Sequence, residues 1–72
     1  MNPFKDAKEA IEYIDNFNGN ASHMNLPISD SLQDSLGINM SLITDKIFDK
    51  GWEPNGYEIK EGFRIYHYKK PE

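Results

Sequence analysis

The sequence contains no cysteine, so disulfide bonds and thiolate metal sites are excluded as sources of stability. This absence fits a reducing compartment, and we expect a cytoplasmic location. No apolar run approaches the roughly 18 residues that a membrane-spanning helix requires, so we expect no membrane partner. The first six residues are not expected to be a secretory signal, because the segment that follows them is amphipathic and acidic.

Basic side chains are scarce as well. The 72 residues include eight Lys and Arg against twelve Asp and Glu, which gives a formal net charge of −4. Residues 1–30 carry two basic and five acidic side chains, residues 31–54 carry two and four, and residues 55–72 carry four and three. Sequence-independent affinity for nucleic acid depends on neutralising phosphates, so the acidic majority of the chain opposes it.

Residue patterns typical of catalytic, cofactor-binding or metal-binding sites are not visible. The spacing of the two histidines, His23 and His67, matches no compact metal-ligand motif. The acidic pair Asp45 and Asp49 lies on the surface of a predicted helix, whereas catalytic acid–base pairs lie in clefts that shift their pKa values. The five glycines are scattered and form no phosphate-binding loop. We therefore expect no cofactor, no metal and no enzymatic activity.

The first predicted helix spans residues 3–17, within one small domain of residues 1–72. Asn2 is expected to cap this helix, because Pro3 suits the first helical position. The apolar side chains that recur at helical spacing are Phe4, Ala7, Ile11 and Ile14. Residues 18–27 are mainly polar, and we interpret them as a linker.

A second, short helix is expected between this linker and Gly37. Ser29 or Asp30 is the expected cap, and Leu32 and Leu36 lie four residues apart, so both fall on one side of the helix. Gly37 would end the helix in the left-handed conformation that residues with a Cβ resist.

The third predicted helix spans residues 40–50, with Asn39 as its expected cap. Its buried stripe is Met40, Ile43 and Ile47. Gly51 is expected to end the helix in a Schellman motif, in which Trp52 packs back onto Ile47.

Residues 51–70 alternate between the two sides of an extended chain and predict a β-hairpin. Residues 54–56 predict a turn ahead of its first long strand. A two-residue turn would pair Ile59 with Arg64, whereas a three-residue loop at residues 60–62 pairs Ile59 with Phe63. We favour the longer loop because it keeps the apolar side chains together and uses a glycine at its end. The outer side of the hairpin would then carry Arg64, Tyr66 and Tyr68.

The order of helix, tight turn, helix and hairpin resembles the winged helix-turn-helix domains. The residues that carry the resemblance are Leu32, Leu36, Gly37, Ile38 and Ile43, together with Gly62 in the hairpin that corresponds to the wing. Two positions depart from the family, because Gln33 stands where a small residue is usual and Lys46 where an apolar residue is expected. The expected fold is an α+β, winged-helix-like domain, with three helices followed by a β-hairpin.

The resemblance implies DNA binding, with the third helix in the major groove. The exposed side of that helix is expected to carry Ser41, Leu42, Asp45 and Asp49. Carboxylates repel phosphates, and this helix offers no arginine to read guanine. A DNA contact would therefore have to be made by Lys60, Arg64, Lys69 and Lys70 of the hairpin.

The composition favours a second function, a small acidic regulatory or adaptor module that binds another protein. The side chains expected to make this contact are Leu42, Asp45, Asp49, Tyr66 and Tyr68. Tyrosine is enriched at the centres of protein interfaces. Alternatively, the two tyrosines pack on the first helix, or they cover the sheet with their hydroxyl groups in water. We expect protein binding as the function and DNA binding through the basic hairpin as the alternative, and the oligomeric state stays open.

Overall fold

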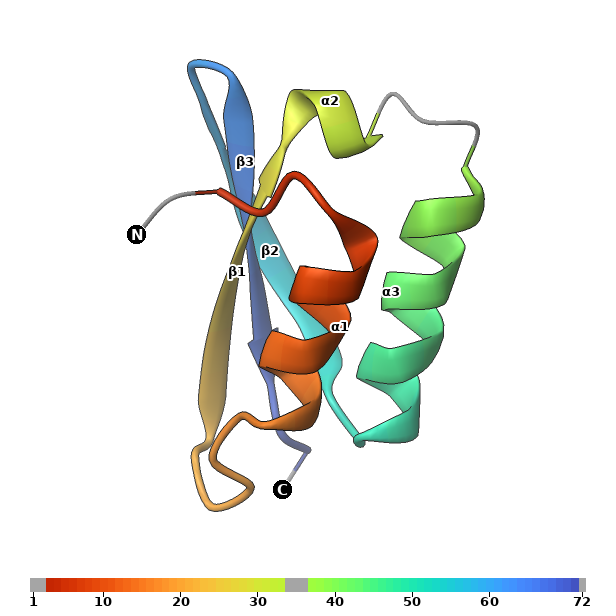
Figure 1. The fold of residues 1–72 in the computed structure, drawn as a ribbon. Coiled ribbons are helices and arrows are strands. Elements are labelled where there is room, and N and C mark those ends of the chain that lie inside the picture. Colours follow the sequence, from red (N-terminus) through yellow and green to blue (C-terminus); the bar gives the residue numbers. More distant parts are fainter. Residues whose placement is uncertain (1–2, 34–36, 72) are drawn as a thin grey trace.

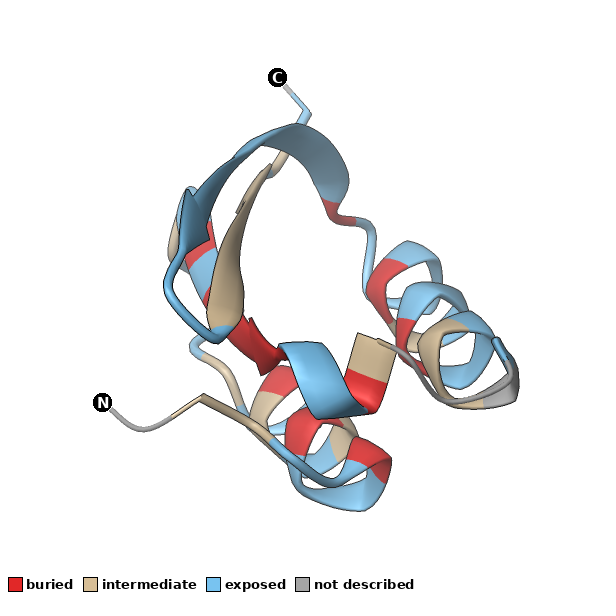
Figure 2. Ribbon diagram, turned by 90° about the horizontal axis from the view of Figure 1, so that it is seen from above, coloured by how far each residue is buried: buried red, intermediate tan, exposed pale blue. Residues whose placement is uncertain are grey.

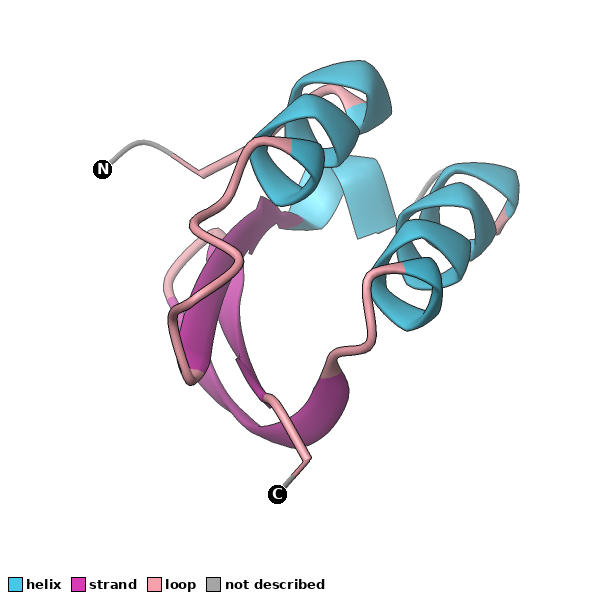
Figure 3. Ribbon diagram, turned by 90° about the horizontal axis from the view of Figure 1, so that it is seen from below, coloured by secondary structure: helices cyan, strands magenta, loops and turns pink. Residues whose placement is uncertain are grey.

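The computed structural model describes residues 3–33 and 37–71, without the side chain of Ile38. The described residues form helices α1 (Ala7–Asp15), α2 (Asp30–Gln33) and α3 (Ile38–Asp49), and strands β1 (His23–Ser29), β2 (Glu53–Lys60) and β3 (Phe63–Lys69). The strands form one antiparallel sheet in the order β1-β3-β2. Helices α1 and α3 lie side by side on one side of this sheet, and no helix formed by the described residues lies on its other side (Figures 1 and 3).

The expected order of three helices followed by a hairpin is wrong, because strand β1 lies between α1 and α2. This strand occupies most of the segment that the sequence pattern assigned to a linker. Its residues Met24, Leu26 and Ile28 alternate with more polar neighbours, and all three are buried. Pro27 obscured the strand pattern, but proline is tolerated in an edge strand, where an amide that faces away from the sheet needs no partner.

The N-terminal residues run along the free edge of β1 before α1 begins. The Phe4 amide donates to the Pro27 carbonyl at 2.9 Å, and the Ser29 amide donates to the Phe4 carbonyl at 2.9 Å. Helix α1 therefore begins at Ala7, later than expected, and Asp6 caps it by accepting from the Lys8 amide. The expected cap, Asn2, lies outside the described residues.

Helix α3 begins and ends at glycines. Its N-terminal boundary is Gly37, with φ at 85°, so the expected cap Asn39 lies inside the helix. The expected Schellman motif at the C-terminus is confirmed, because the Gly51 amide donates to the Phe48 carbonyl and the Trp52 amide to the Ile47 carbonyl, both at 3.0 Å. The expected end of the second helix at Leu36 lies outside the described residues.

The expected three-residue loop of the hairpin is wrong. Lys60 pairs with Phe63 and Ile59 with Arg64, so β2 and β3 are joined by the two-residue turn Glu61–Gly62. Gly62 takes the left-handed conformation that this turn requires, with φ at 84°. The predicted turn at residues 54–56 is also wrong, because these residues belong to β2 and cause a shift in its register.

The shorter turn exchanges the two faces of the hairpin. Tyr66 and Tyr68 pair with the buried Leu26 and Met24 of β1, so they lie on the side that faces the helices. Both tyrosines pack against the core, which is the alternative role that the sequence left open. The free energy gained by burying two large rings outweighs the exposure of Ile59 on β2.

The core lies between the two long helices and strand β1 (Figure 2). Its fully buried large side chains are Ile14, Met24, Leu26, Ile28, Ile43 and Ile47. Trp52 closes one end of the core, with its ring 5.7 Å from that of Phe17 and with the Lys70 ammonium group 4.3 Å above it. Helix α3 packs against α1 and leaves β2 exposed along its whole length.

Candidate protein-binding surface

Large apolar side chains remain exposed where α3 and β2 face each other. Phe48 is 61% exposed, Tyr57 is 56% exposed and Ile59 is 69% exposed. Phe48 and Tyr57 line an open pocket of about 280 Å³, which we call the α3–β2 groove. The groove is lined by Thr44, Ile47 and Phe48 of α3, by Pro54, Gly56 and Tyr57 of β2, and by Tyr66, His67 and Tyr68 of β3.

The groove exists because α3 has more apolar residues than its contact with α1 can cover. Ile43 and Ile47 are buried in the core, whereas Phe48 lies one residue further along the helix and is therefore rotated by about 100°. That rotation directs Phe48 away from α1 and toward β2. Strand β2 offers Tyr57 on the same side, and its ring lies 5.8 Å from that of Tyr66.

The polar atoms near the groove are occupied or hard to ionise. The Tyr66 hydroxyl donates to Oε1 of Gln33 at 2.7 Å. Burial, together with the neighbouring Tyr66, raises the pKa of Tyr68 to about 12, so this hydroxyl stays protonated at neutral pH. The groove thus offers apolar surface and aromatic ring edges, a chemistry that suits apolar side chains of a partner.

His67 takes part in a separate network on the helix-free side of the sheet. Its Nδ1 lies 2.7 Å from Oδ1 of Asn25, and its Nε2 lies 3.5 Å from a carboxylate oxygen of Glu58. His23 is exposed and contacts Ser22, and it lines an open pocket on this side of the sheet together with His67. No group of three or more potential metal ligands occurs in the part of the chain that the structure describes.

The structure separates the residues predicted to contact protein into two groups. Leu42, Asp45 and Asp49 are exposed on α3, and Leu42 is 49% exposed. Asp45 lies three residues before Phe48, which places it beside the groove. Tyr66 and Tyr68 line the groove from the sheet instead of lying on the outer face of the hairpin.

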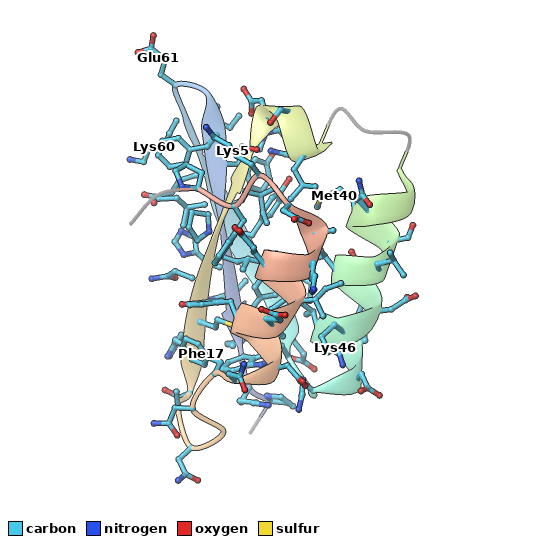
Figure 4. The ribbon with its side chains drawn as sticks, in the orientation of Figure 1. Lys5, Phe17, Met40, Lys46, Lys60 and Glu61 are labelled. Carbon is cyan, nitrogen blue, oxygen red and sulfur yellow. The ribbon has the colours of Figure 1, made fainter. Side chains whose placement is uncertain are left out.

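The residues predicted to contact DNA do not form one surface. Lys60 and Arg64 lie near the hairpin turn, where Lys60 projects at the free end of the hairpin (Figure 4). Lys69 and Lys70 lie about five residues further along the chain, or roughly 17 Å away in an extended strand. The Arg64 guanidinium lies 5.7 Å from the Tyr57 ring, and the Lys70 ammonium group donates to the Lys50 carbonyl as well as lying over Trp52.

Sequence reasoning missed Phe48, Tyr57 and Ile59 as exposed residues. Phe48 lies outside the predicted buried stripe of Met40, Ile43 and Ile47, and the incorrect hairpin loop assigned Ile59 to an apolar face with Phe63. The two-residue turn, which the sequence also allowed, places the side chains of both hairpin strands on their observed sides.

Comparisons with protein-family models, with curated proteins and with solved structures found no match to this chain. Among the described residues, no helix has both the length and the hydrophobicity needed to cross a bilayer.

Proposed function

We propose that this chain is a non-catalytic module that binds another protein through the α3–β2 groove. The observation that carries the proposal is the pairing of exposed Phe48 and Tyr57 across an apolar pocket. Exposed apolar surface of this kind lowers the free energy of the complex when a partner removes it from water. Tyr57 and Phe48 would lie at the centre of the contact, where a few aromatic side chains often supply most of the affinity.

The charges beside the groove indicate the partner's flanking residues. Asp45 and Asp49 are exposed on α3, and within residues 3–33 and 37–71 neither forms an ion pair within 4.0 Å. The two lysines of this helix, Lys46 and Lys50, instead contact Asp15 of α1. An apolar side chain of the partner would therefore enter the groove, with Lys or Arg beside it facing α3. We place this interaction in the cytoplasm, in keeping with the cysteine-free composition.

Affinity capture with paired variants tests the proposal. Phe48→Glu puts a carboxylate into the groove, whereas Ser41→Glu adds the same charge to an exposed position of the same helix outside the groove lining. The proposal is supported by a partner that binds the unmodified chain and Ser41→Glu but not Phe48→Glu, with the difference confirmed by titration of the purified pair. Equal loss in both variants, or recovery of nucleic acid alone, contradicts it.

DNA binding through the hairpin is the second candidate function. It is favoured by Lys60 and Arg64, which both lie near the hairpin turn, on opposite sides of the sheet. It is opposed by the acidic surface of α3. Titration against mixed duplexes at low salt, with the double variant Arg64→Glu and Lys69→Glu as control, distinguishes the two functions. Binding that the double variant abolishes would favour the DNA function over the protein-binding one.

A further inference from the structure

We propose that the free edge of β2 pairs with the same edge of a second copy of this chain, antiparallel about a two-fold axis at Ile59. The resulting dimer would contain a continuous sheet made from both copies. This inference is independent of the α3–β2 groove, because it uses the backbone edge of β2 and the charges on the opposite side of the sheet.

The two edges of the sheet differ in whether their outward-pointing backbone groups are paired. The edge of β1 is covered by Phe4, whose amide and carbonyl bond to Pro27 and Ser29. In the part of the chain that the structure describes, the outer edge of β2 pairs with no strand. Such an edge offers unpaired amides and carbonyls to another strand.

The hairpin register fixes which backbone groups point outward. Lys60 and Phe63 flank a two-residue turn, so they form a hydrogen-bonded pair, and pairs alternate along an antiparallel ladder. Lys60 and Glu58 therefore direct their amides and carbonyls toward β3. Ile59 and Tyr57 direct theirs away from the sheet, where a second strand can bond to them.

Pairing Ile59 with Ile59 of the second copy matches this alternation and also the charges. It places Glu58 opposite the second copy's Lys60, and Lys60 opposite the second copy's Glu58. Both of these are non-hydrogen-bonded pairs, in which side chains lie closest across the strands. The two ion pairs would lie on the helix-free side of the sheet, while the 69% exposed Ile59 would cover its own symmetry mate on the other side.

The other registers that satisfy the backbone lack this complementarity. Centring the pair on Glu58 or on Lys60 would place that charged residue opposite its own symmetry mate, which is repulsive. Centring the pair on Tyr57 would place Glu58 opposite Gly56 and Lys60 opposite Pro54, which removes both ion pairs. It would also bring the irregular part of β2 and a residue without an amide hydrogen into the ladder. Charged residues usually protect an edge strand against pairing, but Glu58 and Lys60 are complementary to a second copy in the Ile59 register.

Charge-exchange variants test the proposal by sedimentation velocity over a range of concentrations. Glu58→Lys gives two lysines and Lys60→Glu gives two glutamates on each strand, so each single variant should self-associate about tenfold more weakly than the unmodified chain. A mixture of the two single variants should form a heterodimer, because each Lys then faces a Glu. The double variant, with the two charges exchanged, should dimerise by itself, because each Lys again faces a Glu of the second copy. Its recovery would show that the weaker association of the single variants is not due to misfolding.

The groove variant Phe48→Glu should dimerise like the unmodified chain, so failure of the groove proposal and failure of this one are distinguishable. An unmodified chain that stays monomeric at all accessible concentrations overturns the inference. Single variants that dimerise normally, or a mixture that stays monomeric, overturn it as well. Capture of an extended segment of another protein on β2 without self-association would assign the edge to a different occupant and also overturn it.

Discussion

The Tyr66 hydroxyl on the central strand donates a 2.7 Å hydrogen bond to Oε1 of Gln33 in α2. The amide group of Gln33 in turn donates to the Ile28 carbonyl of β1 at 3.4 Å. One glutamine thus connects the short helix to two strands. Gln33 is also a position where the sequence departs from the winged-helix pattern, and the structure gives its side chain a role that a small residue could not fill.

Removing the hydroxyl by Tyr66→Phe should lower the free energy of unfolding by about 0.5–1.5 kcal/mol. The expected loss arises because the half-buried Oε1 of Gln33 then lacks its donor. Urea denaturation measures the change. Tyr57→Phe is the matched control, because the Tyr57 side chain is 56% exposed. Removing its hydroxyl group should change the free energy of unfolding by less than about 0.5 kcal/mol. Equal effects of the two substitutions would show that the bond to Gln33 does not stabilise the fold.

Two isoleucines of α1 differ in burial, because one lies in the buried stripe of the helix and the other at its margin. Ile14 is 2% exposed, whereas Ile11 is half-buried at the edge of the core. Ile14→Ala should cost about 2–5 kcal/mol, because it removes three buried carbon atoms and leaves a cavity. Ile11→Ala should cost clearly less, because its site can be filled by water and by neighbouring side chains. Denaturation midpoints of both variants, compared at equal m-values, check the difference.

The contact between α1 and α3 should make stability depend on pH. The Lys50 ammonium group, 2.9 Å from the Asp15 carboxylate, and Lys46 at 3.6 Å lower the pKa of Asp15 (Figure 4 shows Lys46 beside α1). A carboxyl whose pKa is lower in the folded chain stabilises the fold above its unfolded pKa of about 4. That stabilisation is lost as the pH falls through the folded pKa.

Asp15→Asn should therefore be less stable than the unmodified chain at neutral pH, and the two should converge in acid. Because the carboxylate is exposed, high salt should also reduce the difference. Thermal denaturation at several pH values measures both effects. Asp45→Asn is the control, since its carboxylate contacts no basic side chain within 4.0 Å among the described residues. A neutral-pH difference that persists unchanged in acid would assign the effect to packing.

The parts of the fold that depend on local sequence were predictable. The apolar stripe of α3 and the Gly51 end of that helix follow from spacing and from one residue's conformational freedom, and the structure shows both. Strand β1 was missed because Pro27 interrupts its alternation, and its partner β3 lies about 40 residues away along the chain. Local pattern contains no information about that partner.

The candidate site was less predictable because it depends on which side of the sheet the helices cover. Both hairpin loops fit the local sequence, and only the burial of Tyr66 and Tyr68 against α1 and β1 decides between them. The exposure of Phe48 likewise follows from the docking of α3 on α1 instead of on β2. Charge was more informative, since the acidic surface of α3 was expected from the sequence and its aspartates are exposed.

The end of α3 provides a prediction that separates backbone strain from steric contact. Gly51 has φ at +84°, and an added Cβ would lie 3.7 Å from the Lys70 ammonium nitrogen, which is an ordinary contact. Gly51→Ala should therefore lower stability by about 1–2 kcal/mol through the left-handed conformation alone. Gly51→Asn should recover part of that loss, because asparagine tolerates this conformation better.

Gly19→Ala is the control, since its added Cβ meets no atom within 4 Å and its φ lies outside the left-handed range. Urea denaturation should show Gly19→Ala as neutral or slightly stabilising, and an equal loss at both glycines would mean that the left-handed Gly51 does not limit stability.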